Sequence, residues 1–414
     1  MAKLQPVRGT RDLIGEDARA HLHVIDAARA TAGTYGYRPI ETPVFEFTEV
    51  FQRTLGETSD IVTKEMYTFQ DKGGDSLTLR PEGTAGIARA VLSGGLQNEL
   101  PLKWCYAGPM FRHERPQKGR LRQFHQIGVE LIGVAEPIGD VEVIALAAAT
   151  LDALGVLPAT TLELNTLGDN ESRGAYREAL VSYLEQFRDR LSEDSKQRLA
   201  RNPLRILDSK NNDDRAVIAD APSFSDYLTP DAQTFFDAVR GGLDDLRIAY
   251  QINPRLVRGL DYYCHTAFEF TTDQLGAQGT VLAGGRYDGL IEMMGGQPTP
   301  GVGWAAGIER LAMLIGPTST GPRPISVIGI GPAGEKAALK VAQDLRQTGF
   351  TIELNYRGGL KRGLRRADKI GASAAVFLGE DELARDGATV RNLDDGSQTD
   401  VSLAELKDHL AEYR

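Results

Sequence analysis

A segment rich in glycine and proline, GPTSTGPRP at residues 316–324, interrupts the chain. Proline lacks a backbone donor and glycine adds conformational freedom, so such a segment continues neither a helix nor a strand. The residues on its two sides must therefore bury their apolar side chains in separate cores. We expect a large domain over residues 1–320 and a small one over residues 321–414.

The large domain shows helical and strand-like patterns in turn. Apolar, β-rich runs separated by loops at 77–134 predict antiparallel strands, and dense charge with proline breaks between about 168 and 250 predicts an inserted helical module. The other expected elements are a helix at 16–35, a strand-like segment at 37–47, a helix at 140–155, strands at 264–271 and 279–283, and a glycine-rich entry at 301–307 into a helix that ends at 315.

The small domain alternates between the two patterns. Strand-like segments are expected at 324–330, 350–356 and 374–379, with helices at 337–349 and 360–371. Such alternation predicts an α/β domain with a largely parallel sheet.

Composition limits the classes of site that we expect. The formal net charge of −10 argues against indiscriminate binding to nucleic acid, although local basic patches leave a nucleic-acid partner open. No segment resembles a signal peptide or the roughly 18 to 20 apolar residues of a membrane span, so we expect a cytoplasmic protein without a membrane partner. Cys105 and Cys264 lack ligand spacing, so we predict neither disulfides nor a structural zinc site and assign no metal-ligating residue.

Positive charge is concentrated in RHERPQKGRLRQFHQIGVE, residues 112–130, whose first fourteen positions hold five Arg or Lys side chains and two of the six histidines. The alternation of side chains along a strand predicts that Arg112 and Glu114 point to the same face, and that Phe124 and Glu130 also share a face. An arginine can bind a phosphate bidentately, a glutamate can accept from an exocyclic amine, and a phenylalanine ring can stack on a purine. These side chains fit ATP, whereas a basic loop without such neighbours is more often the solvated loop of a charged β-hairpin.

The segment FRHERPQKGRLRQFHQ, residues 111–126, resembles motif 2 of class II aminoacyl-tRNA synthetases in the form typical of histidyl-tRNA synthetases. The resemblance covers nearly the full chain and is weakest at 165–250. Other segments similar to that family occur in the family's order: VRGTRDL at 7–13, a motif 1-like stretch ending at Pro43, TLRPEGTAG at 78–86, LVRGLDYY at 256–263, AGGRYDGL at 283–290 and GIERL at 307–311.

The resemblance implies a histidine-binding site, with the segment from Gly284 to Tyr287 closing it from beneath. An imidazole has two distinct nitrogens, and a buried carboxylate such as Glu130 favours an N–H partner. A site built on such hydrogen bonds can reject amino acids that lack them. The implied histidine-binding residues are Glu82, Gly83 and Thr84 toward the α-amino group, with Arg112, Gln126, Glu130, Arg258, Tyr262, Tyr263 and Tyr287 around the substrate.

The resemblance also implies the catalytic and nucleotide-binding residues. Arg258 would lie over the reacting α-phosphate, where a fixed cation stabilises developing charge, and Arg112 would hold that phosphate. Arg310, in the helix entered through glycines, would reach the γ-phosphate. Glu114 and Phe124 would complete the ATP site, and Mg²⁺ is expected to accompany ATP.

Two sets of residues are expected to contact histidine tRNA. Arg115 and Gln117, in the motif 2-like loop, are the family's candidates for the acceptor end. The small domain resembles an anticodon-binding module, and a basic cluster on its predicted helix makes Arg362 and Arg366 candidate phosphate contacts, with a solvated helix as the alternative. That cluster comprises Arg357, Lys361, Arg362, Arg365, Arg366 and Lys369.

Two other functions have to be considered. GIGPAG at 329–334, with Glu353 about twenty residues on, fits a dinucleotide-binding fingerprint, but Pro332 supplies no N–H to a pyrophosphate. A non-catalytic paralogue, the synthetase-like regulatory subunit of ATP phosphoribosyltransferase, usually loses the arginine of RGLDYY and lacks the C-terminal domain. This chain has Arg258 and about ninety residues after the glycine- and proline-rich segment.

The expected fold is α+β: a class II synthetase-type catalytic domain with a mostly antiparallel sheet and a helical insertion, followed by a C-terminal α/β anticodon-binding domain. The family implies a homodimer formed through the motif 1 region. It also implies activation of L-histidine with ATP to histidyl-adenylate and pyrophosphate, and transfer of histidine to the 3′ end of histidine tRNA.

Overall fold

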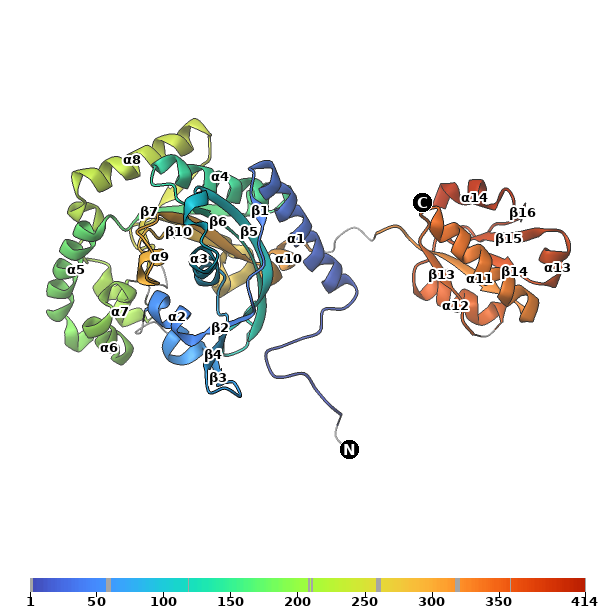
Figure 1. The fold of residues 1–414 in the computed structure, drawn as a ribbon, viewed down its shortest axis with the longest axis horizontal. Coiled ribbons are helices and arrows are strands. Elements are labelled where there is room, and N and C mark those ends of the chain that lie inside the picture. Colours follow the sequence, from blue (N-terminus) through green and yellow to red (C-terminus); the bar gives the residue numbers. More distant parts are fainter. Residues whose placement is uncertain are drawn as a thin grey trace. The chain divides into compact units, whose positions relative to one another are not determined.

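The computed structural model describes residues 3–56, 61–117, 119–207, 209, 211–257, 262–316, 321–357 and 359–413, apart from the side chains of residues 277 and 278. The chain divides into two compact units, residues 1–318 and 319–414, each with its own sheet (Figure 1). Among the described residues, no helix is both long enough and apolar enough to cross a membrane.

An eight-stranded sheet organises the first unit, in the order β1-β5-β6-β11-β10-β9-β7-β8. The inner strands pair antiparallel throughout, and only the short edge strands β1 and β8 pair in parallel. This confirms the predicted, mostly antiparallel sheet. The strands are β1 (Arg38–Pro39), β5 (Leu102–Phe111), β6 (Gln123–Ile132), β7 (Thr161–Thr166), β8 (Gln251–Ile252), β9 (Cys264–Thr271), β10 (Thr280–Arg286) and β11 (Gly301–Gly307).

Helices cover both faces of this sheet. The helices α1 (Glu16–Thr34), α4 (Pro137–Ala153), α8 (Pro230–Asp245) and α10 (Ile308–Ile315) contribute to the core on one face. The other face is covered by α2 (Thr48–Leu55), α3 (Thr84–Ser93) and α9 (Leu290–Met293). A small sheet, ordered β2-β4-β3, consists of β2 (Phe45–Phe47), β3 (Tyr67–Gln70) and β4 (Ser76–Leu79).

The alternation of side chains along β6 separates a packing face from a polar face. Ile127, Val129 and Leu131 are buried in the core beneath α1, α4 and α10. Because successive strand residues point to opposite sides, Gln126 and Glu130 face the other way, toward α3. The polar positions of the motif 2-like segment therefore share one side of the sheet, as predicted.

The glycine-rich segment 301–307 is a strand, β11, and not only the entry to a helix. It pairs with β6 so that Gly303 lies opposite Glu130. A Cβ atom on Gly303 would lie 1.9 Å from Oε2 of Glu130, so glycine is required for this close approach. The pattern of small residues concealed the strand, because glycine has low intrinsic strand propensity.

The segment between β7 and β8 contains the helical insertion. The helices α5 (Asn170–Glu185), α6 (Glu193–Arg201) and α7 (Asn212–Ile218) surround a core of their own, which includes Tyr176, Leu199 and Phe224. In contrast, Phe236 and Val239 of α8 are buried in the main core against the catalytic sheet. Among the described helices of this segment, α5, α6 and α7 form the separate insertion, whereas α8 belongs to the main domain.

The second unit contains a five-stranded sheet in the order β13-β12-β14-β15-β16. The pairs β12–β13 and β12–β14 are parallel, whereas β15 and β16 extend the sheet antiparallel and were not predicted. Its elements are β12 (Ile325–Gly329), α11 (Gly331–Gln347), β13 (Ile352–Leu354), α12 (Leu360–Lys369), β14 (Ala374–Leu378), α13 (Glu380–Ala384), β15 (Gly387–Asn392), β16 (Gln398–Ser402) and α14 (Leu406–His409).

The GIGPAG segment has a packing explanation in this unit. A Cβ atom on Gly334 would lie 2.1 Å from the carbonyl oxygen of Leu378, so the glycine lets α11 approach β14 closely. A glycine for close helix–strand packing is only one part of a dinucleotide fingerprint. The segment therefore gives no separate support to a dinucleotide site.

Candidate active site

A cavity of about 970 Å³ brings together most of the predicted site residues of the first unit. Its walls come from β6, β10, β11 and the segments before α3 and β9, and helix α7 of the insertion also contributes. The predicted residues that line it are Glu82, Thr84, Arg112, Glu114, Phe124, Gln126, Tyr262, Tyr263, Tyr287 and Arg310.

Two buried carboxylates belong to this region: Glu82 lines the cavity, whereas Glu130 is not among the described lining residues and is bonded to two that are, Thr84 and Tyr287. Glu82 is 5% exposed and accepts hydrogen bonds from the backbone N–H groups of Thr84 at 2.7 Å and Ala85 at 2.8 Å, at the start of α3. Glu130 is 1% exposed and accepts from the hydroxyl of Thr84 at 2.7 Å and from the hydroxyl of Tyr287. Thr84 thus connects the two acids.

The protonation of these acids reflects their burial. Burial raises the pKa of Glu130 to about 8, against hydrogen bonds from Tyr287 and Thr84 that favour the ionised form, and the charge of Glu82 raises it further. Burial also raises the pKa of Glu82, opposed by the backbone hydrogen bonds from Ala85 and Thr84. A cation bound beside these groups would stabilise their ionised forms.

Three tyrosines form the aromatic part of the cavity. The rings of Tyr262 and Tyr263 have centroids 4.6 Å apart, and Tyr287 meets Tyr262 edge-on at 5.8 Å. All three side chains are buried. They provide flat apolar surface with hydroxyl groups at the edges, which suits a small heteroaromatic ligand.

A second group of lining residues is basic. The Arg112 guanidinium lies 5.3 Å from the centroid of the Phe124 ring, and its Nε donates to the carbonyl oxygen of Pro81 at 2.9 Å. Glu114 forms an ion pair with Arg120 at 2.8 Å, a lining residue that we did not single out from the sequence. These contacts hold the ends of the motif 2-like loop against the strand.

Arg310 approaches the same region from helix α10. Its Nη1 donates to the carbonyl oxygen of Thr280 at 2.6 Å, and its Nε donates to that of Gly119 at 3.3 Å. Burial lowers the pKa of Arg310, and the charges of Arg120 and Arg112 lower it further. The charges of Glu114 and Glu269 act in the opposite sense, and a bound polyanion would relieve the repulsion that remains among the guanidinium groups.

Some predicted residues lie elsewhere. Arg258 falls outside the described residues. Gly83 precedes α3 and lies against the ring of Tyr106. It is not one of the described residues that line the cavity. Arg115 and Gln117 are exposed in the loop between β5 and β6, consistent with accessibility to a large partner.

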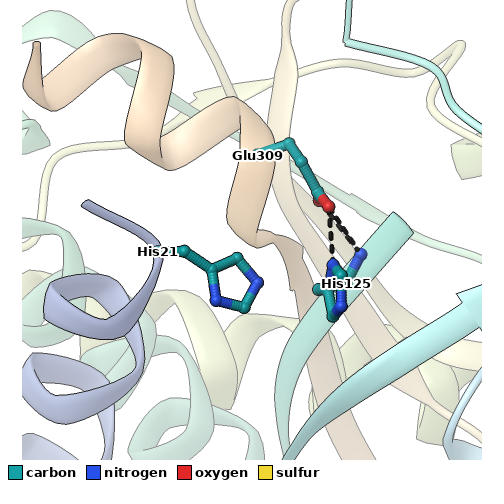
Figure 2. Close-up of side chains that lie close together, drawn as sticks. All are labelled: His21, His125 and Glu309. Carbon is teal, nitrogen blue, oxygen red and sulfur yellow. Dashed lines mark hydrogen bonds and ion pairs between the residues drawn. The ribbon is translucent and has the colours of Figure 1, made fainter. Parts of the chain in front are cut away.

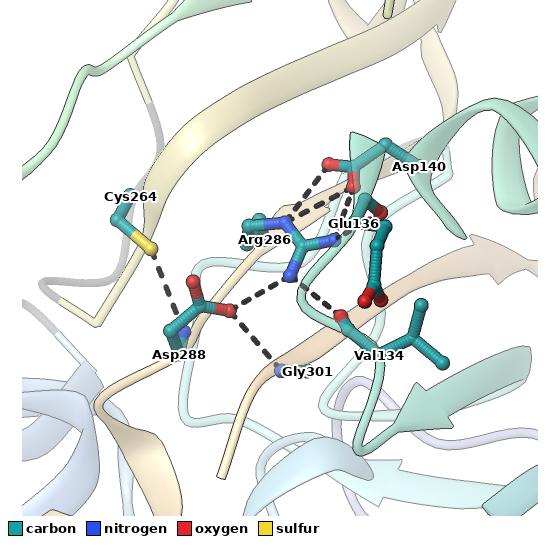
Figure 3. Close-up of polar contacts among 7 residues, drawn as sticks. All are labelled: Val134, Glu136, Asp140, Cys264, Arg286, Asp288 and Gly301. Carbon is teal, nitrogen blue, oxygen red and sulfur yellow. Dashed lines mark hydrogen bonds and ion pairs between the residues drawn. The ribbon is translucent and has the colours of Figure 1, made fainter. Parts of the chain in front are cut away.

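Arg286 is the last residue of β10 and is not among the described residues that line the cavity (Figure 3). Its guanidinium is fully buried and pairs with Asp140 of α4 and with Asp288 at 3.0 Å. It also donates to the carbonyl oxygen of Val134 at 2.9 Å. Because Tyr287 is the next residue, this network fixes the strand end that carries the Tyr287 hydroxyl.

Arg362 and Arg366 lie on α12 in the second unit, and both are exposed. Nε of Arg366 donates to Glu353 of β13 at 2.9 Å, so this arginine has an intramolecular partner. Arg365 and Lys369 are exposed on the same helix, which confirms that the basic cluster is on the surface. Among the described residues, no acidic side chain pairs with Arg362.

Sequence reasoning missed an interaction between β6 and α10 (Figure 2). Glu309 accepts hydrogen bonds from the backbone N–H of His125 at 3.0 Å and from Nδ1 of that ring at 2.8 Å. Glu309 also lines the cavity, as do Glu269 and Arg215. His125 and Glu309 are 184 positions apart, so no local spacing indicates that they meet.

Comparisons with known proteins agree with this arrangement. A family model described as histidyl-tRNA synthetase matches residues 9–311, and one described as anticodon binding domain matches residues 325–413. A Rhodospirillum rubrum protein named histidine–tRNA ligase is 60% identical over 414 residues, covering 100% of both chains. A Gluconacetobacter diazotrophicus protein of the same name is 58% identical over 99% of each chain.

Solved structures give the same result. The structure of apo S. aureus histidyl-tRNA synthetase has a TM-score of 0.82 and 33% identity over 98% of this chain and 99% of that one. A Bacillus halodurans structure titled ATP phosphoribosyltransferase regulatory subunit/histidyl-tRNA synthetase has a TM-score of 0.68 at 23% identity, covering 92% of this chain and 99% of that chain, and shows the shared fold alone. The extent of the family match and the whole-length relatives show that this chain belongs to the histidyl-tRNA synthetase family.

Proposed function

We propose that this chain activates L-histidine with ATP, releasing pyrophosphate, and then transfers histidine from the adenylate to the 3′ end of histidine tRNA. The observation that carries the proposal is the composition of the cavity in the first unit. One group of lining residues consists of the buried Glu82 with three tyrosines, one of which is bonded to the buried Glu130, and the other consists of arginines beside Phe124. The first group suits an amino acid with a cationic amine and an N–H-bearing ring, and the second suits a purine nucleotide triphosphate.

The histidine-binding role rests on Glu130 and Glu82. An imidazole N–H would donate to the Glu130 carboxylate, whose other contacts come from Thr84 and Tyr287. Glu82 would attract the α-ammonium group, and Gln126 lies on the same side of the sheet as Glu130. A buried carboxylate left without such a ligand stays partly protonated, which explains the direction of the Glu130 pKa.

The reaction requires the histidine carboxylate to attack the α-phosphorus of ATP while the bond to pyrophosphate breaks. Arg112 would hold the α-phosphate, Arg310 the γ-phosphate, and Phe124 the adenine ring. Arg258 would stabilise the charge that develops at the α-phosphate. The mutual repulsion of the guanidinium groups without a ligand supports their role in binding a polyanion.

The donor set also fits Mg²⁺. Glu114 and Glu269 line the cavity together with Arg112 and Arg310. Carboxylate oxygens are the protein ligands that Mg²⁺ prefers, usually with substrate phosphates and water completing the coordination. When bound, the ion would neutralise phosphate charge, and these two carboxylates would hold it.

We further propose that tRNA is bound by both units, in a cytoplasmic enzyme. The exposed Arg115 and Gln117 would contact the acceptor end, and the exposed face of α12 would contact phosphates elsewhere on the tRNA. The anticodon-binding family match over residues 325–413 supports the second assignment. Arg362 is the better single candidate, because Arg366 pairs with Glu353.

The proposed homodimer is supported by the small sheet. Its apolar residues face outward: Phe45 is 48%, Phe47 54% and Phe69 45% exposed. Its buried side is polar, with Thr78 fully buried and Glu46 8% exposed. An inverted pattern of this kind is typical of a surface covered by a partner, since exposed aromatic patches otherwise cost free energy.

The decisive experiment is pyrophosphate exchange into ATP, measured with each of the twenty amino acids. Exchange with histidine alone, followed by charging of histidine tRNA, is the expected result. Exchange with a different amino acid would contradict the assigned specificity. If no amino acid supported exchange, the proposed enzymatic activity would be contradicted, and a synthetase-like regulatory function would be favoured.

A further inference from the structure

Three potential metal ligands meet beside the cavity (Figure 2), and although Glu309 lines it, none of the three has a role in the proposed reaction. His21 comes from α1, His125 from β6 and Glu309 from α10. One ligand atom from each side chain lies within 4.8 Å of the other two. These elements are distant in sequence and pack together on one face of the sheet.

The contacts within this cluster leave one nitrogen unexplained. Glu309 is engaged by the ring and the backbone N–H of His125. The His21 ring meets that of His125 edge-on, with centroids 4.4 Å apart at 81°. Nε2 of His21 is buried, yet it has no hydrogen-bond partner among the described residues. A buried polar nitrogen usually has a partner, so its position points to a ligand.

We propose that His21, His125 and Glu309 form a binding site for a divalent transition metal of the zinc class. Two imidazoles and one carboxylate are a common donor set for such ions, whereas Mg²⁺ favours oxygen ligands alone. The backbone N–H of His125 would remain a donor to Glu309 and orient it, as outer contacts do at metal sites.

The geometry requires modest side-chain adjustments, including a lengthening of the 2.8 Å contact between Nδ1 of His125 and Glu309 if that nitrogen binds the ion. Bonds of about 2.0 to 2.2 Å in a tetrahedral site put neighbouring ligand atoms roughly 3.3 to 3.5 Å apart. The present separations, up to 4.8 Å, would decrease by roughly 1.5 Å at most. His21 can make this adjustment because its side chain, in the second turn of α1, is only partly buried. Water would supply the remaining coordination position.

Such an ion would connect α1, β6 and α10. Its role would be to hold α1 against β6, which carries Phe124, and against α10, which carries Arg310. The site is distinct from the proposed Mg²⁺ position, which uses Glu114 and Glu269. The inference does not depend on which amino acid the cavity binds.

The test is metal binding by the purified full-length chain after treatment with a chelator. Co²⁺ is titrated as a spectroscopic substitute, and Zn²⁺ is then added as competitor. We expect one bound equivalent of Co²⁺ with intense visible bands of a low-coordinate site, displaced by Zn²⁺ and not by Mg²⁺. Zn²⁺ should also raise the melting temperature of the protein, because it binds the folded state.

The matched variants are His21→Ala and His23→Ala. His23 is exposed on the same helix and lies outside the cluster, so its variant should bind Co²⁺ like the parent. His21→Ala should weaken binding tenfold or more and lose the Zn²⁺-dependent rise in melting temperature. Alanine favours a helix, and His21→Gln provides a second variant whose folding can be checked by circular dichroism.

Two results would overturn the proposal. One is the absence of a stoichiometric Co²⁺ site in the parent protein. The other is equal Co²⁺ affinity in the parent and in folded His21→Ala. Either would mean that His21 and His125 only pack edge-to-face, with Glu309 as the hydrogen-bond partner of His125.

Discussion

The hydroxyl of Thr84, at the first residue of α3, donates a hydrogen bond of 2.7 Å to Oε1 of Glu130 near the C-terminal end of β6. The hydroxyl of Tyr287 donates to the other oxygen of the same carboxylate. Glu130 is thus oriented by two segments that are far from it in sequence. Its orientation and its raised pKa make it the first residue to test.

Replacing Glu130 with Gln should weaken selection of histidine more than it weakens folding. Glutamine keeps the volume and one acceptor but removes the charge that favours an N–H-bearing or protonated ring. Losing a hydrogen bond to a charged group costs about 1.5 to 3 kcal/mol, or roughly 10- to 150-fold in kcat/KM. Steady-state pyrophosphate exchange with histidine and competing amino acids measures this loss. Unchanged KM and unchanged rejection of competitors would make Glu130 a structural residue.

The raised pKa of Glu130 also predicts how stability varies with pH. The folded-state pKa of about 8 exceeds the ordinary value of 4.5, so the folded protein binds the extra proton between these values. This contribution to stability is complete below about pH 4.5 and is lost as the pH rises through about 8. Without histidine, the unfolding free energy of Glu130→Gln should therefore increase relative to the parent over this range, by up to about 1.4 kcal/mol per pH unit. Urea denaturation at several pH values tests it, and a constant difference would contradict it.

Gly303→Ala should destabilise the protein and impair histidine binding together. The added Cβ would lie 1.9 Å from the Glu130 carboxylate and 2.4 Å from the carbonyl oxygen of Val129, so strand pairing must shift. Overpacking of this kind costs about 1 to 3 kcal/mol. Gly289→Ala is the control, since its Cβ would meet nothing within 4 Å. Thermal unfolding and histidine KM should change only in Gly303→Ala, and equal behaviour of the two variants would contradict the packing argument.

Arg362→Glu should raise the KM for tRNA while leaving histidine-dependent pyrophosphate exchange nearly unchanged. A lost phosphate contact reduces the salt dependence of tRNA binding by about 0.9 in logarithmic slope. Lys340→Glu is the control, because Lys340 is exposed on α11, which packs on a different core cluster from α12. Measuring tRNA aminoacylation at a series of salt concentrations distinguishes the Arg362→Glu and Lys340→Glu variants. Normal charging by Arg362→Glu at every salt concentration would remove α12 from the tRNA-binding surface.

Phe69→Lys should convert the proposed dimer into a monomer, because a charge would be buried at the covered face of the small sheet. Leu246→Lys is a control of similar exposure, 54% against 45% for Phe69, at the end of α8. Sedimentation velocity measures the oligomeric state directly. A parent protein that is monomeric, or a Phe69→Lys variant that remains dimeric, would contradict the proposed interface.

The elements with regular periodicity could be predicted from sequence. Helix 16–35 and the strands around the motif 2-like loop are present close to their expected bounds, because their apolar positions repeat at the helical or strand period. The strand Gly301–Gly307 was missed because glycine has low intrinsic strand propensity. Its glycines are explained by the neighbouring strand, where Glu130 leaves no space for a side chain at position 303. The antiparallel strands β15 and β16 are short and partly polar, so their pattern was weak.

The site residues that belong to short sequence motifs could be predicted. Glu82 with Thr84, Arg112 with Glu114, and Arg310 each lie in a short recognisable segment, and the fold brings them to one cavity. Contacts such as His125 with Glu309 join segments 184 positions apart, and no spacing rule anticipates them. The role of Arg286 was also hidden, because its partner Asp140 lies on a helix with no motif of its own.

Strand β11 ends at Gly307 and helix α10 begins at the next residue, with no loop between them. Gly303 lies opposite Glu130, and Arg310 follows within the first turn of the helix. On the proposed assignment, the spacing between the amino acid and the triphosphate is set by continuous main-chain hydrogen bonding. Redesign of amino-acid specificity through side chains would then leave nucleotide alignment unchanged. Inserting or deleting one residue between positions 303 and 310 would instead abolish activation of every amino acid, whatever the pocket recognises.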